Sequence, residues 1–171
     1  MYLEKIIKAK KKIEDVVIKT PLIYSEVFSK KSRNQVYMKC ENLQLTGAYK
    51  IRGALNKIRS LSDEEKSKGV VCSSAGNHAQ GVAFAASQAN VKSTIVMPKT
   101  TPLLKIQSTK DLGGNVVLSG YIYDDAFNEA KRIEQEQGAL FIHPFNDIDV
   151  ICGQGTVALE IFEDLNDVDI I

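Results

Sequence analysis

The spacing of hydrophobic and polar residues changes several times along the chain. Between residues 3 and 17, apolar side chains recur every three or four positions, which predicts an amphipathic helix. Thr20-Pro21 ends this helix, because the residue before a proline disfavours helical backbone angles. Residues 35–40 alternate between apolar and polar side chains, as a strand does. A second helix is predicted over residues 48–61, with Thr46 as its cap.

From residue 70 onward, short apolar runs alternate with helical patterns. The predicted strands cover residues 70–74, 93–97, 115–118, 139–142 and 168–171. The predicted helices between them cover residues 76–88, 102–112, 124–137 and 155–165. Strands that alternate with helices across short loops predict an open, parallel, twisted sheet of the α/β class, with helices on both faces. Ligands of such sheets bind beyond the carboxyl ends of the strands, where helices begin.

The end of the chain is unusual for a domain. Val168–Ile171 has the pattern of an apolar strand that is just beginning, and no turn signal follows it. Because domains rarely end inside a buried strand, we expect that the chain is truncated.

The composition is that of a soluble globular protein. The chain has 171 residues, of which 44% are hydrophobic and 25% are charged, and its net charge of +1 gives no reason to expect nucleic acid as a partner. No apolar run approaches the roughly 20 residues that span a bilayer, and charges occupy the positions where a secretory signal is apolar. We therefore expect a cytoplasmic protein with no membrane partner.

Cysteine and histidine residues are too few and too scattered for a metal site. The three cysteines lie far apart without a CxxC pair, and the chain has only two histidines. The motifs GxGxxG, Walker A and GxSxG are absent, so nucleotide, hydride and serine-hydrolase chemistry lack their usual support. We expect neither a disulfide framework nor a metal ion.

The strongest local signal is SSAGNHAQG, residues 73–81, between a predicted strand and a predicted helix. Gly76 permits a tight turn, and the first amides of the following helix are unpaired at the positive end of the helix dipole. Polar side chains there come from Ser73, Ser74, Asn77 and His78, and together they predict a site for a carboxylate or a phosphate. A serine-capped helix with a buried histidine explains the same spacing equally well.

Lys50 lies in TGAYKIRGA, residues 46–54, among small residues and directly after Tyr49. The helical pattern alone favours a solvated lysine, or one that snorkels with Arg52 and Lys57. The functional alternative is a Schiff-base lysine, whose amine attacks a carbonyl only when it is deprotonated; burial among apolar neighbours favours that state. The small residues would then leave room for a flat ring.

Two weaker signals lie nearer the C-terminus. GQGT, residues 153–156, is interpreted as a glycine turn that opens a helix, and by itself it is more typical of tight packing than of a ligand site. His143-Pro144 follows a predicted strand and belongs to a loop at the same carboxyl edge of the sheet, where a single histidine is more often structural than catalytic.

Taken in order and spacing, these segments resemble one family. ENLQLTGAYKIRGA, SSAGNHAQGVA, VMPKTTPLLKI and GQGTVALEI are similar to motifs of the fold-type II pyridoxal-phosphate enzymes. Within that family, the chain most resembles the short, catabolic type of threonine ammonia-lyase, also called threonine/serine dehydratase. The resemblance runs along nearly the whole chain, and the lysine motif together with AGNHAQG is specific to the group.

The resemblance implies a role for each residue of the two main motifs. Lys50 corresponds to the lysine that holds pyridoxal 5'-phosphate covalently, and Tyr49 takes the place of an aromatic residue, usually phenylalanine, that packs against the cofactor ring. Asn77 matches the asparagine that hydrogen-bonds the ring hydroxyl oxygen. The loop implied for the substrate carboxylate consists of Ser74, Ala75, Gly76, Asn77 and His78.

The reaction that the resemblance implies is α,β-elimination, from L-threonine to 2-oxobutanoate and ammonia, or from L-serine to pyruvate and ammonia. Serine racemase, hydroxyaspartate dehydratase and a non-catalytic fragment or degenerate paralogue are the alternatives. Ala75 favours elimination over racemisation, because the related racemases place at this position a serine that returns a proton to the opposite ring face.

The resemblance also implies how the chain divides. Residues 1–52 correspond to the N-terminal part of a large domain, residues 53–145 to a small α/β domain, and residues 146–171 to a return into an incomplete large domain. Family members continue into a glycine-rich loop that holds the cofactor phosphate, so we expect the chain alone to bind the cofactor weakly and to turn over poorly. A homo-oligomer is implied as well, and a nucleotide effector such as AMP is left open.

Overall fold

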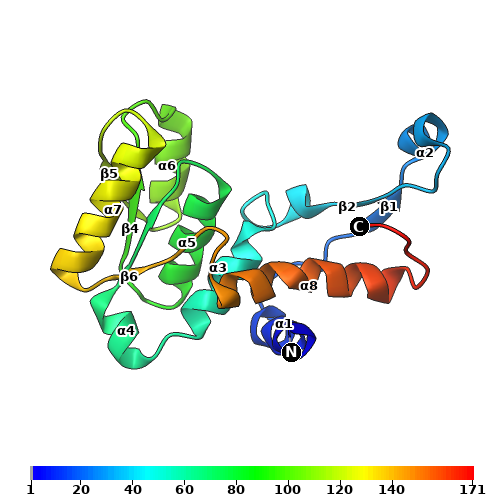
Figure 1. The fold of residues 1–171 in the computed structure, drawn as a ribbon, viewed down its shortest axis with the longest axis horizontal. Coiled ribbons are helices and arrows are strands. Elements are labelled where there is room, and N and C mark those ends of the chain that lie inside the picture. Colours follow the sequence, from blue (N-terminus) through cyan, green and yellow to red (C-terminus); the bar gives the residue numbers. More distant parts are fainter. Residues whose placement is uncertain (1) are drawn as a thin grey trace.

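The computed structural model describes residues 2–171, in which an α/β lobe is joined to an elongated arm (Figure 1). The arm is built from α1 (Tyr2–Ile13), β1 (Leu22–Tyr24), α2 (Glu26–Ser32), β2 (Tyr37–Lys39), the short 3-10 helix η1 (Glu41–Leu43) and α8 (Ile148–Asp164). The lobe is built from α3 (Lys50–Arg59), α4 (Asp63–Lys68), β3 (Val70–Ser73), α5 (Asn77–Gln88), β4 (Ser93–Met97), α6 (Leu103–Asp111), β5 (Asn115–Leu118), α7 (Tyr123–Gln137) and β6 (Leu140–Phe141).

The lobe is organised around a parallel sheet with the strand order β5-β4-β3-β6. Every residue of the central strand β3 is buried, as expected where helices cover both faces of a parallel sheet. α5 lies against one face of the sheet, and α3 packs on the side of α5 that is away from the strands (Figure 1). α7 lies against the other face of the sheet. The predicted open, parallel α/β sheet with helices on both faces is therefore confirmed.

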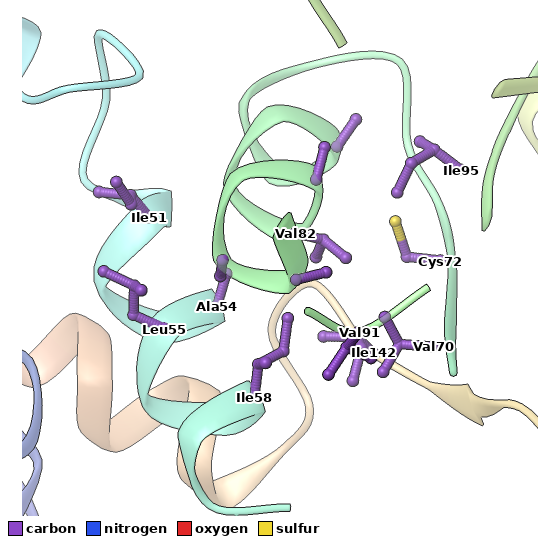
Figure 2. Packing of buried hydrophobic residues seen from close by; sticks show 14 of the residues in the cluster. Ile51, Ala54, Leu55, Ile58, Val70, Cys72, Val82, Val91, Ile95 and Ile142 are labelled. Carbon is purple, nitrogen blue, oxygen red and sulfur yellow. The ribbon is translucent and has the colours of Figure 1, made fainter. Parts of the chain in front are cut away.

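Alternate residues of the strands contribute to two separate clusters. Val70, Cys72 and Ile95 pack with buried side chains of α5 and α3 (Figure 2). Val71 and Val96, which have the opposite parity, pack with the alanines and the isoleucine on the inner stripe of α7. Because complete burial of one such aliphatic side chain contributes about 1.5–3 kcal/mol, the two clusters fix the helices firmly on the sheet.

The arm consists of a short antiparallel pairing, β1 with β2, and the long helix α8, which packs against α1 and α3. The sequence pattern did not predict β1, α2 or α4, and it predicted β2 at twice its length. Elements of three to seven residues are too short to show a hydrophobic period, so pairing and caps determine them instead. The hydroxyl of Ser25, for example, accepts from the amide of Phe28 and begins α2.

The interpretation of Gly153–Thr156 as a turn that opens a helix is wrong. These residues lie inside α8, which begins at Ile148. Asp147 caps it, because its carboxylate accepts from the amides of Asp149 at 2.8 Å and Val150 at 3.2 Å. The glycine serves a close approach between helices instead, as described below.

Two further predictions of local structure are also wrong. Thr46 does not cap α3: Tyr49 precedes the helix without a side-chain cap, and the hydroxyl of Thr46 is buried without a hydrogen-bond partner among the described residues. Val168–Ile171 does not form a strand, since no described strand pairs with it. An apolar run becomes a strand only where a neighbour accepts its backbone hydrogen bonds.

Candidate active site

Lys50 is the first residue of α3 and is half-buried. Its amine donates a 3.0 Å hydrogen bond to the carbonyl oxygen of Pro144, in the loop that follows β6. The ring of Tyr49, which is 42% exposed, lies with its centroid 5.2 Å from the same nitrogen. Within residues 2–171, no carboxylate lies at ion-pair distance from this amine. The amine is therefore directed at the loop beyond the sheet.

The segment from Ser74 to Asn77 connects β3 to α5. The amide of Ser74 continues the sheet by donating to Val96, and its hydroxyl accepts from the amide of Gly76 at 3.2 Å. Gly76 precedes α5 without a side-chain cap, and a Cβ added there would meet no atom within 4 Å. Ala75 packs against the main core cluster, whereas Asn77 is exposed and begins the helix.

The first turn of α5 is the electropositive end of this site. Among residues 2–171, the amides of Asn77, His78 and Ala79 have no backbone acceptor, and the amide of Gln80 is the first to bond within the helix, to Gly76. Unpaired first-turn amides together with the helix dipole favour a bound anion. The alternative interpretation of this segment, a helix capped by a serine, is wrong in its cap, because neither Ser73 nor Ser74 caps α5 with its side chain.

His78 lies in that turn with its ring almost fully buried. Its Nε2 is 3.0 Å from the carbonyl oxygen of Ile142, which can only accept, so Nε2 carries the proton. Burial lowers the pKa of His78 to about 4, with a smaller contribution from the charge of Lys50. The ring is therefore neutral at pH 7, and its Nδ1 is a buried acceptor without a partner in the described residues.

Close backbone contacts bring Lys50 and the α5 terminus together. A Cβ added to Gly81 of α5 would lie 3.1 Å from the carbonyl oxygen of Lys50. A Cβ added to Gly153 of α8 would lie 2.5 Å from the carbonyl oxygen of Arg52. α3 is thus held between two helices, tightly against α5 and, against α8, at a distance that only glycine allows. Lys50 is placed beside α5 by this packing.

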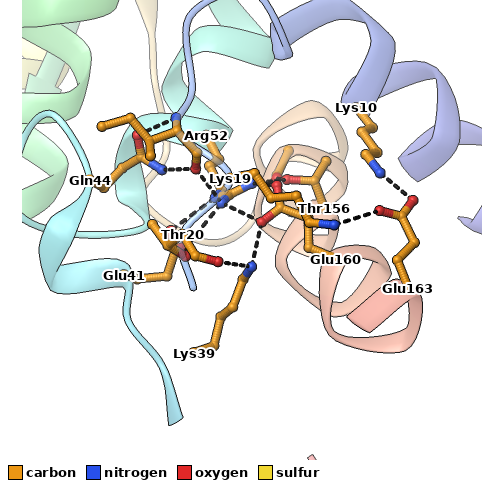
Figure 3. Close-up of polar contacts among 12 residues, drawn as sticks. Lys10, Lys19, Thr20, Lys39, Glu41, Gln44, Arg52, Thr156, Glu160 and Glu163 are labelled. Carbon is orange, nitrogen blue, oxygen red and sulfur yellow. Dashed lines mark hydrogen bonds and ion pairs between the residues drawn. The ribbon is translucent and has the colours of Figure 1, made fainter. Parts of the chain in front are cut away.

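The far side of α3 is closed by a buried ion network (Figure 3). The guanidinium of Arg52 is completely buried and donates to both carboxylate oxygens of Glu41 and of Glu160. Lys39 forms a 2.7 Å ion pair with Glu160 and lies 4.0 Å from a carboxylate oxygen of Asp164, so the network continues toward the end of α8. Burial raises the pKa of Glu41, but hydrogen bonds from Arg52 and Thr20 outweigh burial and lower it.

The structure thus gathers the predicted residues of both motifs at one edge of the lobe. Lys50 and Tyr49 come from the start of α3, and the residues from Ser74 to His78 come from the start of α5. The backbone carbonyls of Ile142 and Pro144, which hold His78 and Lys50, were not predicted, because a carbonyl leaves no mark in the sequence. The adjacent His143-Pro144 pair had nonetheless indicated a loop at this edge.

Two other expectations concern what the described residues contain. Among residues 2–171, no group of three or more cysteine, histidine, aspartate or glutamate side chains is placed to hold a metal ion. Over the same residues, no helix has both the length and the apolar character needed to cross a membrane.

A family profile described as "Pyridoxal-phosphate dependent enzyme" matches residues 13–171. The chain belongs to this family. Its L-threonine ammonia-lyase relative from Thermotoga maritima is 53% identical over 169 residues, which are 99% of this chain and 42% of the relative. The catabolic L-threonine dehydratase TdcB of Escherichia coli K12 is 44% identical over 98% of this chain and 51% of its own length.

Solved structures of this pyridoxal-phosphate dependent family have the same fold. The processed form of threonine deaminase isoform 2 from Solanum lycopersicum matches with a TM-score of 0.92 and 43% identity, over 98% of this chain and 48% of that one. Maize serine racemase matches with a TM-score of 0.93 and 39% identity, over 97% of this chain and 50% of that one. The chain thus spans about half the length of the relatives that it matches.

The described residues fit the reactive part of pyridoxal phosphate. An aldehyde requires an amine that is not engaged by a carboxylate, and Lys50 meets this condition. Open space in front of Gly76, where an added Cβ would meet no atom within 4 Å, lies at the same edge. The unpaired amides at the start of α5 suit an anionic group.

Proposed function

We propose that this chain contributes the reactive lysine and the carboxylate-binding helix terminus of a threonine/serine ammonia-lyase. The whole enzyme would convert L-threonine to 2-oxobutanoate and ammonia, and L-serine to pyruvate and ammonia. The observation that carries this proposal is the amine of Lys50, free of any described carboxylate, beside the unpaired start of α5. Identities of 44–53% to proteins named L-threonine ammonia-lyase or dehydratase support the substrate class.

Pyridoxal phosphate, when bound, supplies an electron sink for negative charge at the α-carbon of an amino acid. Lys50 would hold its aldehyde, Tyr49 would pack against the ring, and Asn77 would bond the ring hydroxyl. With the substrate bound, the amine of Lys50 would act as the base that takes the α-proton. The β-hydroxyl would leave as water, and hydrolysis of the released product would then consume one water molecule and give ammonia.

The α5 terminus would hold the substrate carboxylate. The free amides of Asn77 and His78 supply donors, and Ser74, Ala75 and Gly76 shape the loop. A neutral His78 adds no charge to this site, so the orientation of the substrate depends on the amides and the dipole. The preference among threonine, serine and hydroxyaspartate would then depend on contacts to the β-carbon.

Serine racemase is the second candidate, because the maize enzyme matches with a TM-score of 0.93. Ala75 argues against it: a methyl group cannot return a proton to the ring face opposite Lys50. Formation of substantial D-serine by the complete enzyme would overturn this part of the proposal.

The division of the chain and its assembly belong to the same proposal. Residues 1–52 and 146–171 are assigned to a large domain and residues 53–145 to a small one, although α3 runs continuously across the first boundary. A homo-oligomer in the cytoplasm, with a nucleotide as a candidate effector, completes the proposal. The remaining alternatives are a hydroxyaspartate dehydratase, which differs in substrate, and a non-catalytic fragment, which does not turn over.

Borohydride trapping tests the central claim. Incubation with pyridoxal phosphate and reduction should leave a phosphopyridoxyl group on Lys50, located by peptide mass spectrometry. Lys50→Ala should abolish the label, while Lys99→Ala, a change in a lysine whose amine lies over the ring of Tyr121, should leave it intact. No label on Lys50 would favour a non-catalytic fragment. Steady-state rates of the complete enzyme with threonine, serine and hydroxyaspartate then rank the substrates.

A further inference from the structure

The first turn of α3 lacks one of its regular hydrogen bonds. In a regular α-helix, the amide of Gly53 donates to the carbonyl four residues earlier, that of Tyr49. Here the Tyr49 carbonyl accepts from Arg52 instead, at 3.0 Å. The amide of Gly53 donates across to α8, to the side-chain oxygen Oε1 of Gln154 at 3.2 Å. One side chain thus replaces a backbone acceptor in the turn that begins with Lys50.

The side-chain nitrogen of Gln154 reaches the beginning of the first turn of α3. Nε2 of Gln154 lies 3.5 Å from the carbonyl oxygen of Lys50, at the outer limit of a hydrogen bond. Gln154 therefore spans the turn from Lys50 to Gly53. Residue 53 must be glycine for this arrangement, since a Cβ there would overlap the Gln154 amide and lie 2.8 Å from the carbonyl oxygen of Val150.

The neighbouring glycine fixes the height of α8 against α3. A Cβ at Gly153 would lie 2.6 Å from the Cα of Gly53, so the helices touch through their backbones at this level. Because α8 touches α3 at Gly153, the side chain of the next residue, Gln154, lies against the first turn of α3. This accounts for GQGT, which lies in the middle of α8.

We propose that Gln154 is a positioning residue for Lys50, and this rests on the proposed function above. Its amide sets the tight first turn of α3, and so fixes the direction in which the lysine amine leaves the helix toward Pro144 and the start of α5. Gln154 has no contact with the reacting atoms. It acts through the backbone, and the net stability that its long hydrogen bonds add is small.

Two substitutions at this position and one elsewhere form the test. Gln154→Leu keeps the size and removes both polar atoms, while Gln154→Glu keeps an acceptor for Gly53 and removes the donor to Lys50. Gln107→Leu is the matched control, because Gln107 lies on α6 and bonds only Asp111 among the described residues. Three measurements are made: hydrogen exchange of the Gly53 amide by NMR, reductive methylation of Lys50 by formaldehyde, and the rate of pyridoxal phosphate trapping on Lys50.

We expect Gln154→Leu to speed exchange at Gly53 and to slow trapping on Lys50, each by about five- to tenfold, the equivalent of one ordinary hydrogen bond. Gln154→Glu should restore protection at Gly53 and most of the trapping rate, and Gln107→Leu should match the unsubstituted chain. A merely structural role would instead lower the urea midpoint and slow every lysine alike. Trapping at the original rate in Gln154→Leu overturns the proposal.

The outcomes separate this proposal from the proposed function. If the unsubstituted chain takes no pyridoxal phosphate on Lys50, the proposed function fails, and positioning is then judged from Gly53 exchange and from the methylation rate of Lys50. If Gln154→Leu does not fold, Gln154→Glu decides: a protected Gly53 amide with near-original trapping supports positioning, and lost trapping beside a protected Gly53 refutes it.

Discussion

Lys50 and Arg52 are cations two residues apart on the same helix, and their surroundings are opposite. Arg52 is completely buried and bonded to two carboxylates (Figure 3). Lys50 is bonded to a backbone carbonyl and has no carboxylate partner among the described residues. Two helical steps rotate a side chain by about 200°, so the two residues point to opposite sides of α3. One side of the helix is closed and the other is open.

The difference lies in how each charge is balanced. Arg52 and Lys39 face Glu41 and Glu160, so the buried network needs no further ligand. Among residues 2–171, the amine of Lys50 has no such counter-charge, and it bonds the carbonyl oxygen of Pro144 at the edge of the sheet. A buried, neutralised rear face thereby supports the opposite face of the same short helix, where we propose the reactive lysine. The predictions that follow test this division.

The largest effect is expected from removing the buried cation. Arg52→Met leaves Glu41 and Glu160 close together with only Lys39 between them, which should lower the free energy of unfolding by about 3–5 kcal/mol. Lys50→Met should change it by less than about 1 kcal/mol, because no buried partner is lost. Urea unfolding followed by circular dichroism measures both. Equal losses would show that the two sides of α3 do not differ.

A smaller effect is expected from added methyl groups at two glycines. Gly153→Ala places its Cβ 2.5 Å from the Arg52 carbonyl oxygen, so α8 must move, and we expect a loss of about 1–3 kcal/mol. Gly76→Ala meets no atom within 4 Å and should change the free energy of unfolding by less than about 0.5 kcal/mol. Thermal and urea midpoints compare the pair. A larger loss of stability in Gly76→Ala than in Gly153→Ala would contradict the close packing of α8 against α3.

The smallest effect is expected from titration of the closed face. Because the pKa of Glu41 is lowered below its ordinary value of 4.5, its ionised form stabilises the fold fully above that value. This contribution is lost as the pH falls further, through the folded-state pKa. Stability measured from pH 6 to pH 3 should therefore fall less steeply in Glu41→Gln than in the unsubstituted chain. Lys50→Met should keep the original slope; a flattened slope in that variant contradicts the comparison.

Particular residues show how far sequence reasoning reached. The alternating pattern after residue 70 placed SSAGNHAQG correctly at the junction of β3 and α5, because strand and helix periods are local properties. The GQGT segment was misplaced, since a glycine at a turn and a glycine at a helix contact look the same in sequence. Snorkelling of Lys50 together with Arg52 was one alternative that the helical pattern left open. The complete burial of Arg52 follows from carboxylates that lie 11 and 108 residues away along the chain.

The sequence by itself determined the class of sheet, the presence of a helix that includes Lys50 and the strand-to-helix junction that carries Gly76, Asn77 and His78. These features depend on side-chain period, proline and glycine over a few residues. Only the tertiary structure decided that Lys50 bonds Pro144, that Gln154 completes the first turn of α3 and that Arg52 is neutralised. Those contacts join residues some 90 or more positions apart, and they depend on how closely three helices approach one another.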